Sequence, residues 1–352
     1  MLLAVTLGLV IEKLVLIIVV VMASLLIAMY TTFAERKVAA ILQDRRGPNR
    51  AGPFGLLQPV ADGLKLFFKE EIIPDFSNKF LFVLGPGLAM LTAIMTSAVV
   101  PWGSTIHLFG RDISLQIADV NIGILYVFGV VSMGVYGIMI GAWASNNKYS
   151  LMGGMRAASQ IISYELAIGV SLIALLMVTG TLSLKEMVVQ QQQGGWGGLL
   201  SWNILKQPLG FLIFLICAFA ECNRTPFDLA EAENELIGGY HTEYSSMKLG
   251  FYLFAEYVNM FISSVIMSTL FFGGYDIPFV NEANLAPNVA AGLGVLALMA
   301  KVAFFIFLFM WVRWTIPRFR YDQLMRLGWR VLIPLALFNM LATGAAILYF
   351  HK

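Results

Sequence analysis

Long apolar runs alternate with short polar connections along the whole chain. Eight of these runs come close to the roughly 20 residues that an α-helix needs to cross a bilayer. They lie near residues 11–33, 79–101, 120–144, 160–180, 207–222, 248–273, 290–313 and 330–350. The fifth run is short, so its polar C-terminal end is expected in a cavity lined by protein. The pattern predicts an all-α, polytopic membrane protein with eight transmembrane helices in a single domain, residues 1–352.

The connection between the first two spans holds an amphipathic segment, residues 54–70. Its apolar residues recur at helical spacing, while another face carries Gln58, Asp62, Lys65 and Lys69. This pattern predicts a helix that lies along the membrane surface. A solvated basic loop that only fixes the topology is the alternative.

Composition and loop charge extend this prediction to the orientation in the membrane. Of the 352 residues, 59% are hydrophobic and 12% are charged, against about 25% charged in a soluble domain. Lys and Arg favour cytoplasmic loops, and they gather between the first two spans and in residues 314–329. Eight spans then place both termini on the outer side of the membrane, and the acidic loop 223–247 on the cytoplasmic side.

Acidic residues gather around the fifth and sixth spans. Residues 220–256 hold seven of them, namely Glu221, Asp228, Glu231, Glu233, Glu235, Glu243 and Glu256. Thr225 has the pattern of a helix N-cap, which predicts a short helix that ends at Gly238. Asp228, Glu231 and Glu235 would share one face of it, where mutual repulsion favours protonated carboxyls.

Four ionisable residues of the later apolar spans are candidates for a functional role. A charge inside a membrane helix costs about 2.5 to 3.5 kcal/mol on insertion scales, so each one is a functional hypothesis. Glu165 lies in the fourth span, Glu221 at the end of the fifth, Glu256 in the sixth and Lys301 in the seventh. Together with the loop acids, they are a candidate path for protons. A solvated acidic face is the alternative for the loop acids.

Motifs for cofactor chemistry are missing from the sequence. It has no GxGxxG after a strand, no P-loop and no nucleophile elbow. Cys217 and Cys222 lack a metal-binding spacing and the three histidines are scattered, so no metal site is expected. Any redox chemistry would therefore belong to partner subunits, and no catalytic residue is assigned to this chain. The sequence gives no support for nucleic-acid binding.

Three long motifs carry a resemblance to a known family. They lie in residues 33–70, 220–248 and 311–325, and read FAERKV with GPNRAGPFGLLQPVADGLKLFFKE, then AECNRTPFDLAEAENELIGGYHTEYSSMK, then WVRWTIPRFRYDQLM. These motifs resemble the signatures of a membrane subunit of respiratory complex I, called the H subunit in bacteria and subunit 1 in mitochondria. The resemblance spans nearly the whole chain.

The resemblance implies an eight-helix subunit where the peripheral and membrane arms of complex I meet. In that family the subunit forms much of the tunnel for a lipid-soluble quinone, which is reduced on neighbouring soluble subunits. The complex is a proton-translocating NADH:quinone oxidoreductase, expected here in a bacterial cytoplasmic (inner) membrane rather than a mitochondrial one. The resemblance implies quinone as the substrate, and it assigns FMN and the iron–sulfur clusters to partner subunits. The implied partners are other complex I subunits and the lipid bilayer.

The resemblance also implies roles for individual residues. The family's chain of glutamates, which links the quinone cavity to the pumping subunits, matches Glu165, Glu221, Glu231, Glu233, Glu235 and Glu256. The intramembrane Lys301 is assigned to the same proton relay. Positions that line or border the quinone tunnel match Glu35, Arg36, Asp62, Arg224, Phe227, Asp228 and Arg313. Glu243 stays unassigned.

Two other functions remain open at this point. A stand-alone ion transporter would also need buried acids and a lysine, and it would be expected to show paired broken helices or repeats. An anchor subunit of a membrane hydrogenase or a deazaflavin-linked dehydrogenase is homologous to the family above. The soluble subunits that copurify with the chain would separate that anchor from a complex I subunit.

Overall fold

Long helices make up most of the chain. The computed structural model describes residues 2–108, 111–193, 201–278, 280 and 286–350. Within these residues, seven helical segments are long and apolar enough to cross a membrane. They are α1 (Leu2–Leu42), α3 (Lys79–Met95), α4 (Gly123–Ala144), α5 (Lys148–Thr179), α10 (Ser246–Phe271), α11 (Pro287–Thr315) and the C-terminal segment from α12 (Tyr321–Arg326) to α13 (Ile333–Phe350). The predicted all-α, polytopic membrane fold is confirmed in its main feature.

The fifth predicted span, residues 207–222, corresponds to a shorter helix, α8 (Pro208–Glu221). Its 14 residues give a length of about 21 Å, whereas the hydrocarbon core of a bilayer is about 30 Å thick. The helix begins at a proline and ends where the sequence turns polar, just before Asn223 and Arg224. Among the described residues there are therefore seven long apolar helices and one short one.

Short elements join the long helices. They include α2 (Gln58–Phe68), α6 (Leu184–Gln192), α7 (Asn203–Lys206), α9 (Glu233–Leu236) and a π-helical turn, Leu327–Leu332, between α12 and α13. Strand β1 (Thr105–Leu108) pairs antiparallel with β2 (Arg111–Ser114). The sequence pattern missed this hairpin because its strands have only four residues each. The Asn288 amide holds it by bonding both the backbone N–H and the carbonyl of His107.

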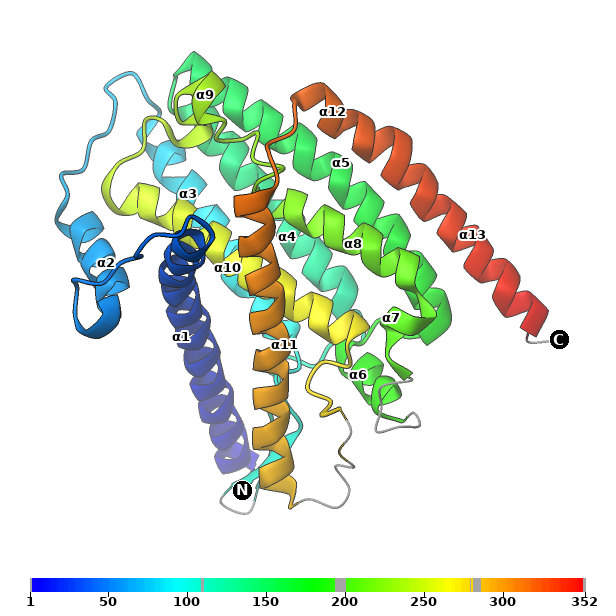
Figure 1. The fold of residues 1–352 in the computed structure, drawn as a ribbon. Helices are drawn as coiled ribbons and strands as arrows, with labels where there is room; N and C mark the ends of the chain where they lie inside the picture. The colour runs from blue at the N-terminus through cyan, green and yellow to red at the C-terminus, as the bar shows by residue number, and fades with distance from the viewer. Residues whose placement is uncertain (1, 109–110, 194–200, 279, 281–285, 351–352) are drawn as a thin grey trace.

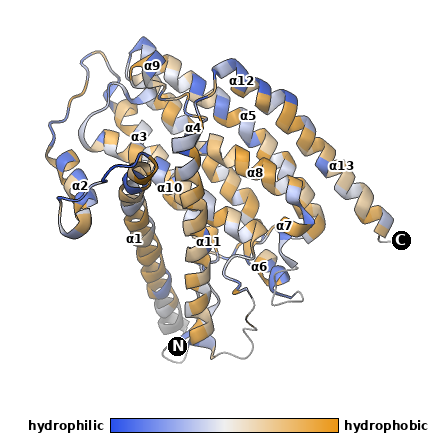
Figure 2. Cartoon of the chain, in the orientation of Figure 1, coloured by the Kyte–Doolittle hydropathy of each residue, from blue (hydrophilic) through white to orange (hydrophobic). Residues whose placement is uncertain are grey.

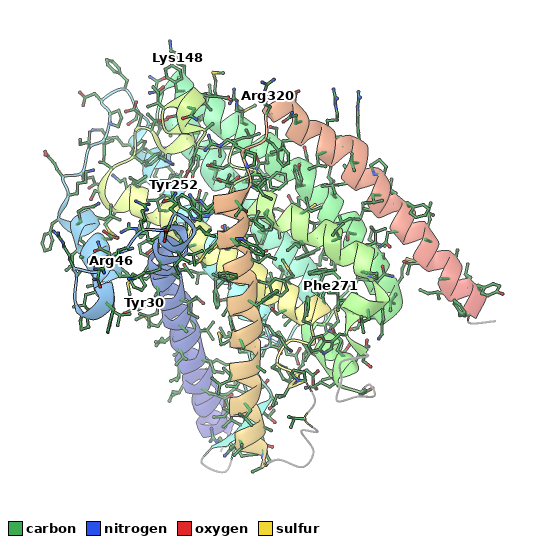
Figure 3. All side chains as sticks on the ribbon, viewed as in Figure 1. Tyr30, Arg46, Lys148, Tyr252, Phe271 and Arg320 are labelled. Atoms are coloured by element: carbon green, nitrogen blue, oxygen red, sulfur yellow. The ribbon has the colours of Figure 1, made fainter. Side chains whose placement is uncertain are left out.

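The connections between the helices lie alternately at the two ends of the bundle (Figure 1). One end holds residues 43–78, 145–147, 222–245 and 316–320, and we call it the polar end. Figure 2 shows hydrophilic residues concentrated around α9 and α12 at this end, while the helix shafts are mostly hydrophobic. Lys148 and Arg320 lie at the same end in Figure 3, away from Phe271. The start of α1 and the end of α13 lie away from the polar end in Figure 1.

Helix α10 runs through the interior of the bundle. It packs against α1, α3 and α11, and nearly all residues of its second half, from Val258 to Phe271, are buried. In Figure 1 it passes among the other helices rather than around them. Any side chain on this half of α10 therefore contacts protein, whichever way it points.

The predicted loop helix from Thr225 to Gly238 is wrong for most of its length, because only Glu233–Leu236 is helical. The backbone groups that a helix would pair locally are instead bonded to distant segments. The Pro226 carbonyl accepts from Phe319 N–H at 3.1 Å, and the Ala230 carbonyl accepts from Tyr240 N–H at 3.4 Å. Tertiary hydrogen bonds thus override the local capping pattern.

Helices α3, α4 and α10 approach closely around Gly141. Tyr252 on α10 donates a hydrogen bond to the Gly137 carbonyl at 3.0 Å, and Tyr244 donates to the Gly141 carbonyl at 3.1 Å. A Cβ atom at Gly141 would lie 1.9 Å from the Tyr252 hydroxyl and 2.8 Å from the Tyr244 hydroxyl. Glycine is required here because the two tyrosines occupy the space of a side chain.

Replacing Gly141 by alanine should therefore destabilise the bundle by about 1 to 3 kcal/mol, the usual cost of overpacking. Less chain should accumulate in membranes, and it should lose extractable, folded protein at a lower temperature. Gly129→Ala on the same helix is the matched control, since its Cβ would have no atom within 4 Å. Equal accumulation and equal thermal loss for both variants would contradict this account.

A buried charge cluster and its cavities

Charged side chains from several elements meet inside the polar end of the bundle. Glu35 comes from α1, Arg224 from the loop after α8, Glu256 from α10 and Arg313 from the last turn of α11. Glu35, Arg224 and Glu256 are between 5% and 8% exposed. Buried charges persist in proteins only when they are paired, so these contacts decide how the site is built.

Glu35 is held by three partners. Its Oε1 atom lies 2.5 Å from Arg313 Nη1, and its Oε2 atom accepts a hydrogen bond from the Tyr257 hydroxyl at 2.9 Å. Arg224 Nη1 lies 4.0 Å from the same carboxylate. A single carboxylate on α1 therefore ties together α10, α11 and the loop.

Arg224 stands between two carboxylates. Its Nη2 atom is 3.7 Å from Glu256 Oε2, and its guanidinium lies 4.2 Å over the ring of Tyr257. Burial lowers the pKa of Arg224, but Tyr257, Glu256 and Glu35 outweigh burial and raise it above the usual value. Arg224 therefore stays charged. Its Nε and Nη2 atoms are buried without a hydrogen bond to any described residue.

Asp228 and Arg318 form a second pair beside this centre. Arg318 Nη2 donates to Asp228 Oδ2 at 2.8 Å. Burial and the charge of Glu231 raise the pKa of Asp228 to about 6, although Arg318 and Arg313 act in the opposite direction. The pKa of Asp228 is therefore raised toward neutral pH by its surroundings, so a change in the charge of Glu231 or Arg318 shifts its protonation.

Glu231 and His241 form a third pair, with Nε2 of His241 3.3 Å from Oε1 of Glu231. Burial raises the pKa of Glu231, but the hydrogen bond and charge of His241 lower it below the ordinary value. Burial lowers the pKa of His241, and the bond to Glu231 raises it above the ordinary value. The adjacent Tyr240 donates from its hydroxyl to Glu256 Oε1 at 2.9 Å, which links this pair to α10.

Glu165 and Glu221 lie beyond this cluster. Ser132 on α4 donates a hydrogen bond to Oε1 of Glu165 on α5. Glu221, the last residue of α8, is close enough to Glu165 for their charges to interact. Glu221 also lines two small cavities of about 40 and 20 Å³, and the larger one reaches Tyr240 and Glu256.

A larger cavity of about 390 Å³ lies between α1, α2, α10 and α11. Its apolar lining includes Met29, Leu253 and Phe254, and Glu35 and Tyr257 are among its polar groups. At its edge, Arg36 on α1 pairs with Asp62 on α2 at 2.7 Å. Helix α2, which is shorter than the predicted segment 54–70, thereby forms one wall.

Three other predicted site residues have partners away from the cluster. Glu235 is on the surface, 2.5 Å from Arg156 on α5. Lys301 donates to the carbonyls of Phe272, Gly274 and Asp276 at 2.7, 2.9 and 2.7 Å, where α10 has ended. Phe227 is buried against the rings of Tyr164 and Phe319. The side chain of Glu233 lies outside the described part of the chain.

Several residues of the site were missed in the sequence. They are His241, Tyr240, Tyr257, Arg318 and Ser132. Three of them, His241, Tyr240 and Arg318, lie within the quoted motifs, which was an available signal. Ser132 has no signal, because a serine in an apolar helix is common. Glu243, left unassigned, accepts from Asn147 Nδ2 at 2.6 Å at the start of α5.

Metal binding finds no support in the part of the chain that the structure describes, where no three His, Cys, Asp or Glu side chains are grouped to hold an ion. Cys217 and Cys222 are buried and unbonded to each other. Long apolar helices with ionisable groups buried and paired between them define a polytopic membrane protein.

Comparison with known proteins identifies the family. The sequence matches the NADH dehydrogenase family over residues 14–344. It is 65% identical to one NADH-quinone oxidoreductase H subunit of Cytophaga hutchinsonii, over 96% of this chain and 97% of that protein. It is 67% identical to the H subunit of the same enzyme from Flavobacterium johnsoniae, over 96% of both chains. The chain belongs to the family of NADH-quinone oxidoreductase H subunits, and it is a multi-pass membrane component of that enzyme complex, as the three motifs predicted.

The pair of Glu231 and His241 predicts a pH dependence of stability. Because the pKa of His241 is raised on folding, its charge stabilises the folded state fully below pH 6.5, and this stabilisation is lost as the pH rises through the folded pKa. Because the pKa of Glu231 is lowered on folding, its charge stabilises the folded state fully above pH 4.5. We expect His241→Gln to destabilise the complex by about 2 kcal/mol near pH 6 and by less near pH 9, since the contribution of the charged imidazole declines as the pH rises through its folded pKa.

Thermal inactivation of the purified complex at the two pH values measures this difference. His107→Gln is the control, because the His107 imidazole also contacts a carboxylate, that of Asp112, but its side chain is 48% exposed, where solvent screening leaves an ion pair worth little. A loss of stability in His241→Gln that is the same at both pH values would contradict the ion pair.

Proposed function

We propose that this chain forms the access tunnel for a lipid-soluble quinone and couples quinone reduction to proton translocation through buried carboxyl groups. The observation that carries this proposal is the continuity of contacts from the 390 Å³ cavity, through Glu35 and Arg224, to Glu256. In the enzyme complex, NADH oxidation, FMN and the iron–sulfur clusters belong to partner subunits.

The cavity has the properties that a quinone tunnel requires. Its volume falls within the range of about 300 to 1,000 Å³ that is usual for small-molecule sites. An apolar lining suits an isoprenoid tail, and Arg36, Asp62 and Lys65 along α2 and α1 supply a polar margin. We assign α2 to the membrane surface, where its exposed Phe67 and Phe68 would enter the lipid boundary.

Charge changes in the cavity reach the cluster by electrostatics. Glu35 lines the cavity and lies 4.0 Å from Arg224, which in turn is 3.7 Å from Glu256. Unit charges about 4 Å apart interact by about 4 kcal/mol at an effective dielectric constant of about 20. Because Arg224 is attracted to both carboxylates, a proton taken up by Glu35 would leave the charge of Arg224 to Glu256 alone and favour the ionised form of Glu256.

From Glu256 the proposed relay continues into the membrane interior. The cavity of about 40 Å³ connects Glu256 with Glu221, and Glu221 interacts with Glu165. Asp228 and Glu231 join the relay on the side of the loop, through Arg313, Arg318 and His241. The contacts thus support Glu165, Glu221, Glu231 and Glu256. The relay roles of Glu233, Glu235 and Lys301 stay predictions from the sequence.

The orientation and the partners follow from the polar end. Its Lys and Arg residues favour the cytoplasmic side of a bacterial inner membrane, so we place the peripheral arm of the complex against it. The alternation of the connections between the two ends supports the proposal that α8 also crosses, as the eighth span of a single membrane domain. Both termini then lie on the outer side.

The relay is tested by Glu165→Gln and Glu231→Gln in the assembled complex. Each change removes a proton-binding group while keeping the shape of the side chain. Quinone reductase activity and proton pumping should fall together by roughly tenfold or more, while NADH oxidation by a hydrophilic artificial acceptor is retained. Glu186→Gln, at an acid on α6 outside the proposed relay, is the control. Full pumping in both relay variants would refute the proposal.

The tunnel is tested at Gly63, which lines the 390 Å³ cavity and whose Cβ would have no atom within 4 Å. Gly63→Trp should obstruct the cavity and lower kcat/KM for a long-tailed quinone by roughly tenfold or more. Gly63→Ala should be silent, and a hydrophilic acceptor should be reduced normally by both variants. If the tryptophan variant reduces the long-tailed quinone as well as the alanine variant does, this cavity is not the tunnel.

A further inference from the structure

Helix α10 carries a line of polar side chains along one face. Tyr252, Glu256, Asn259 and Ser263 follow one another at spacings of four, three and four residues, which places them on the same side of an α-helix. Tyr252 donates to Gly137 O, and Glu256 accepts from Tyr240. Asn259 differs from both, because its amide makes no hydrogen bond to any described residue.

Asn259 faces the two small cavities that also reach Glu221. In the cavity of about 40 Å³ it lies with Glu221 and Glu256, and in the cavity of about 20 Å³ it lies with Glu221 and Ser263. A volume of about 10 to 15 Å³ on this measure is enough for one water molecule, if polar partners are present. Each cavity therefore has both the room and the polar groups to hold water.

Proton transfer from Glu256 to Glu221 needs a hydrogen-bonded connection. The side chains that α4 contributes to the larger cavity, Val131, Val135 and Ile138, are apolar. Three polar side chains that also line it have partners already, since Tyr240 donates to Glu256, Tyr252 donates to the Gly137 carbonyl and Asn223 accepts from Gln160. An amide side chain can supply the connection, because it donates through Nδ2 and accepts through Oδ1. It also does not ionise near neutral pH, so it can hold water without retaining the proton itself.

We infer that Asn259 binds and orients water between Glu256 and Glu221, and is the positioning residue that joins the cluster at the polar end to the carboxylates inside the membrane. The site takes water as its ligand, in two cavities that meet at this amide. The inference rests on the proposed function, because it assigns Asn259 to the same proton relay.

The experiment compares Asn259→Leu with Asn259→Ser in the whole complex. Leucine has a branched side chain like that of asparagine but offers no hydrogen bond, whereas serine keeps a donor and an acceptor and leaves room for more water. Ser264→Ala is the matched control on α10, since the Ser264 hydroxyl donates only to the local carbonyl of Met260, at 2.8 Å. Quinone reductase activity, pumping, reduction of a hydrophilic acceptor and the solvent deuterium isotope effect are measured for each variant.

The leucine variant should lose roughly tenfold or more of its quinone reductase activity and pumping, with a larger solvent isotope effect and normal reduction of the hydrophilic acceptor. The serine variant should restore at least half of the activity, and the Ser264→Ala control should behave as the unaltered complex. A purely structural residue would not raise the isotope effect. If the leucine variant does not assemble, the smaller Asn259→Val takes its place with the same expected outcome.

The outcomes separate this inference from the proposed function. Glu221→Gln and Glu256→Gln are measured in parallel. If these two variants lose activity while Asn259→Leu retains both its activity and its isotope effect, the role of Asn259 is overturned and the relay stands. If all three variants pump normally, the relay itself is overturned.

Discussion

The pairing of buried charges around Arg224 is the constraint on which the polar end depends. A charged side chain taken out of water costs several kcal/mol unless partners compensate it, and removing one partner of a buried pair costs about 3 to 5 kcal/mol. The compensation here is spread over α1, α10, α11 and the loop after α8. The loop can adopt its conformation only when all three helices are in place, so the charges act as a condition for correct packing.

Some buried polar atoms of the same cluster lack a hydrogen bond. Two guanidinium nitrogens of Arg224 and Oδ1 of Asp228 are buried without a hydrogen bond to a described residue. A site optimised for stability alone would pair these atoms or replace them by apolar groups. The unsatisfied guanidinium donors leave the cluster able to bind a hydrogen-bond acceptor, such as water or a carbonyl oxygen, that arrives from the cavity. Incomplete hydrogen bonding of this kind fits the proposal of a site that changes its protonation during turnover.

The sequence was sufficient for the family and for most of the ionisable residues, because charges stand out in apolar helices and the motifs are long. It was not sufficient for their pairing. Arg318 and Asp228 are 90 residues apart, and nothing local connects Tyr240 with the carboxylate of Glu256. The loop after α8 shows the opposite error, since a good capping pattern at Thr225 yielded to tertiary hydrogen bonds. Lys301 shows a third limit: hydropathy reports a charge inside a span, but not the three carbonyls that it contacts.

The contacts of Lys301 with those three carbonyls help to fix the position of α10. Lys301, together with the Gln191 amide that accepts from Gly273 N–H at 3.0 Å, fixes the end of α10 that lies away from the polar end. At its other end, the Ser246 hydroxyl donates to the carbonyl of Leu66, and Glu256 is held by Arg224. Contacts at both ends of α10 resist sliding of the helix along its axis, so its polar face keeps a fixed height relative to α4 and α8.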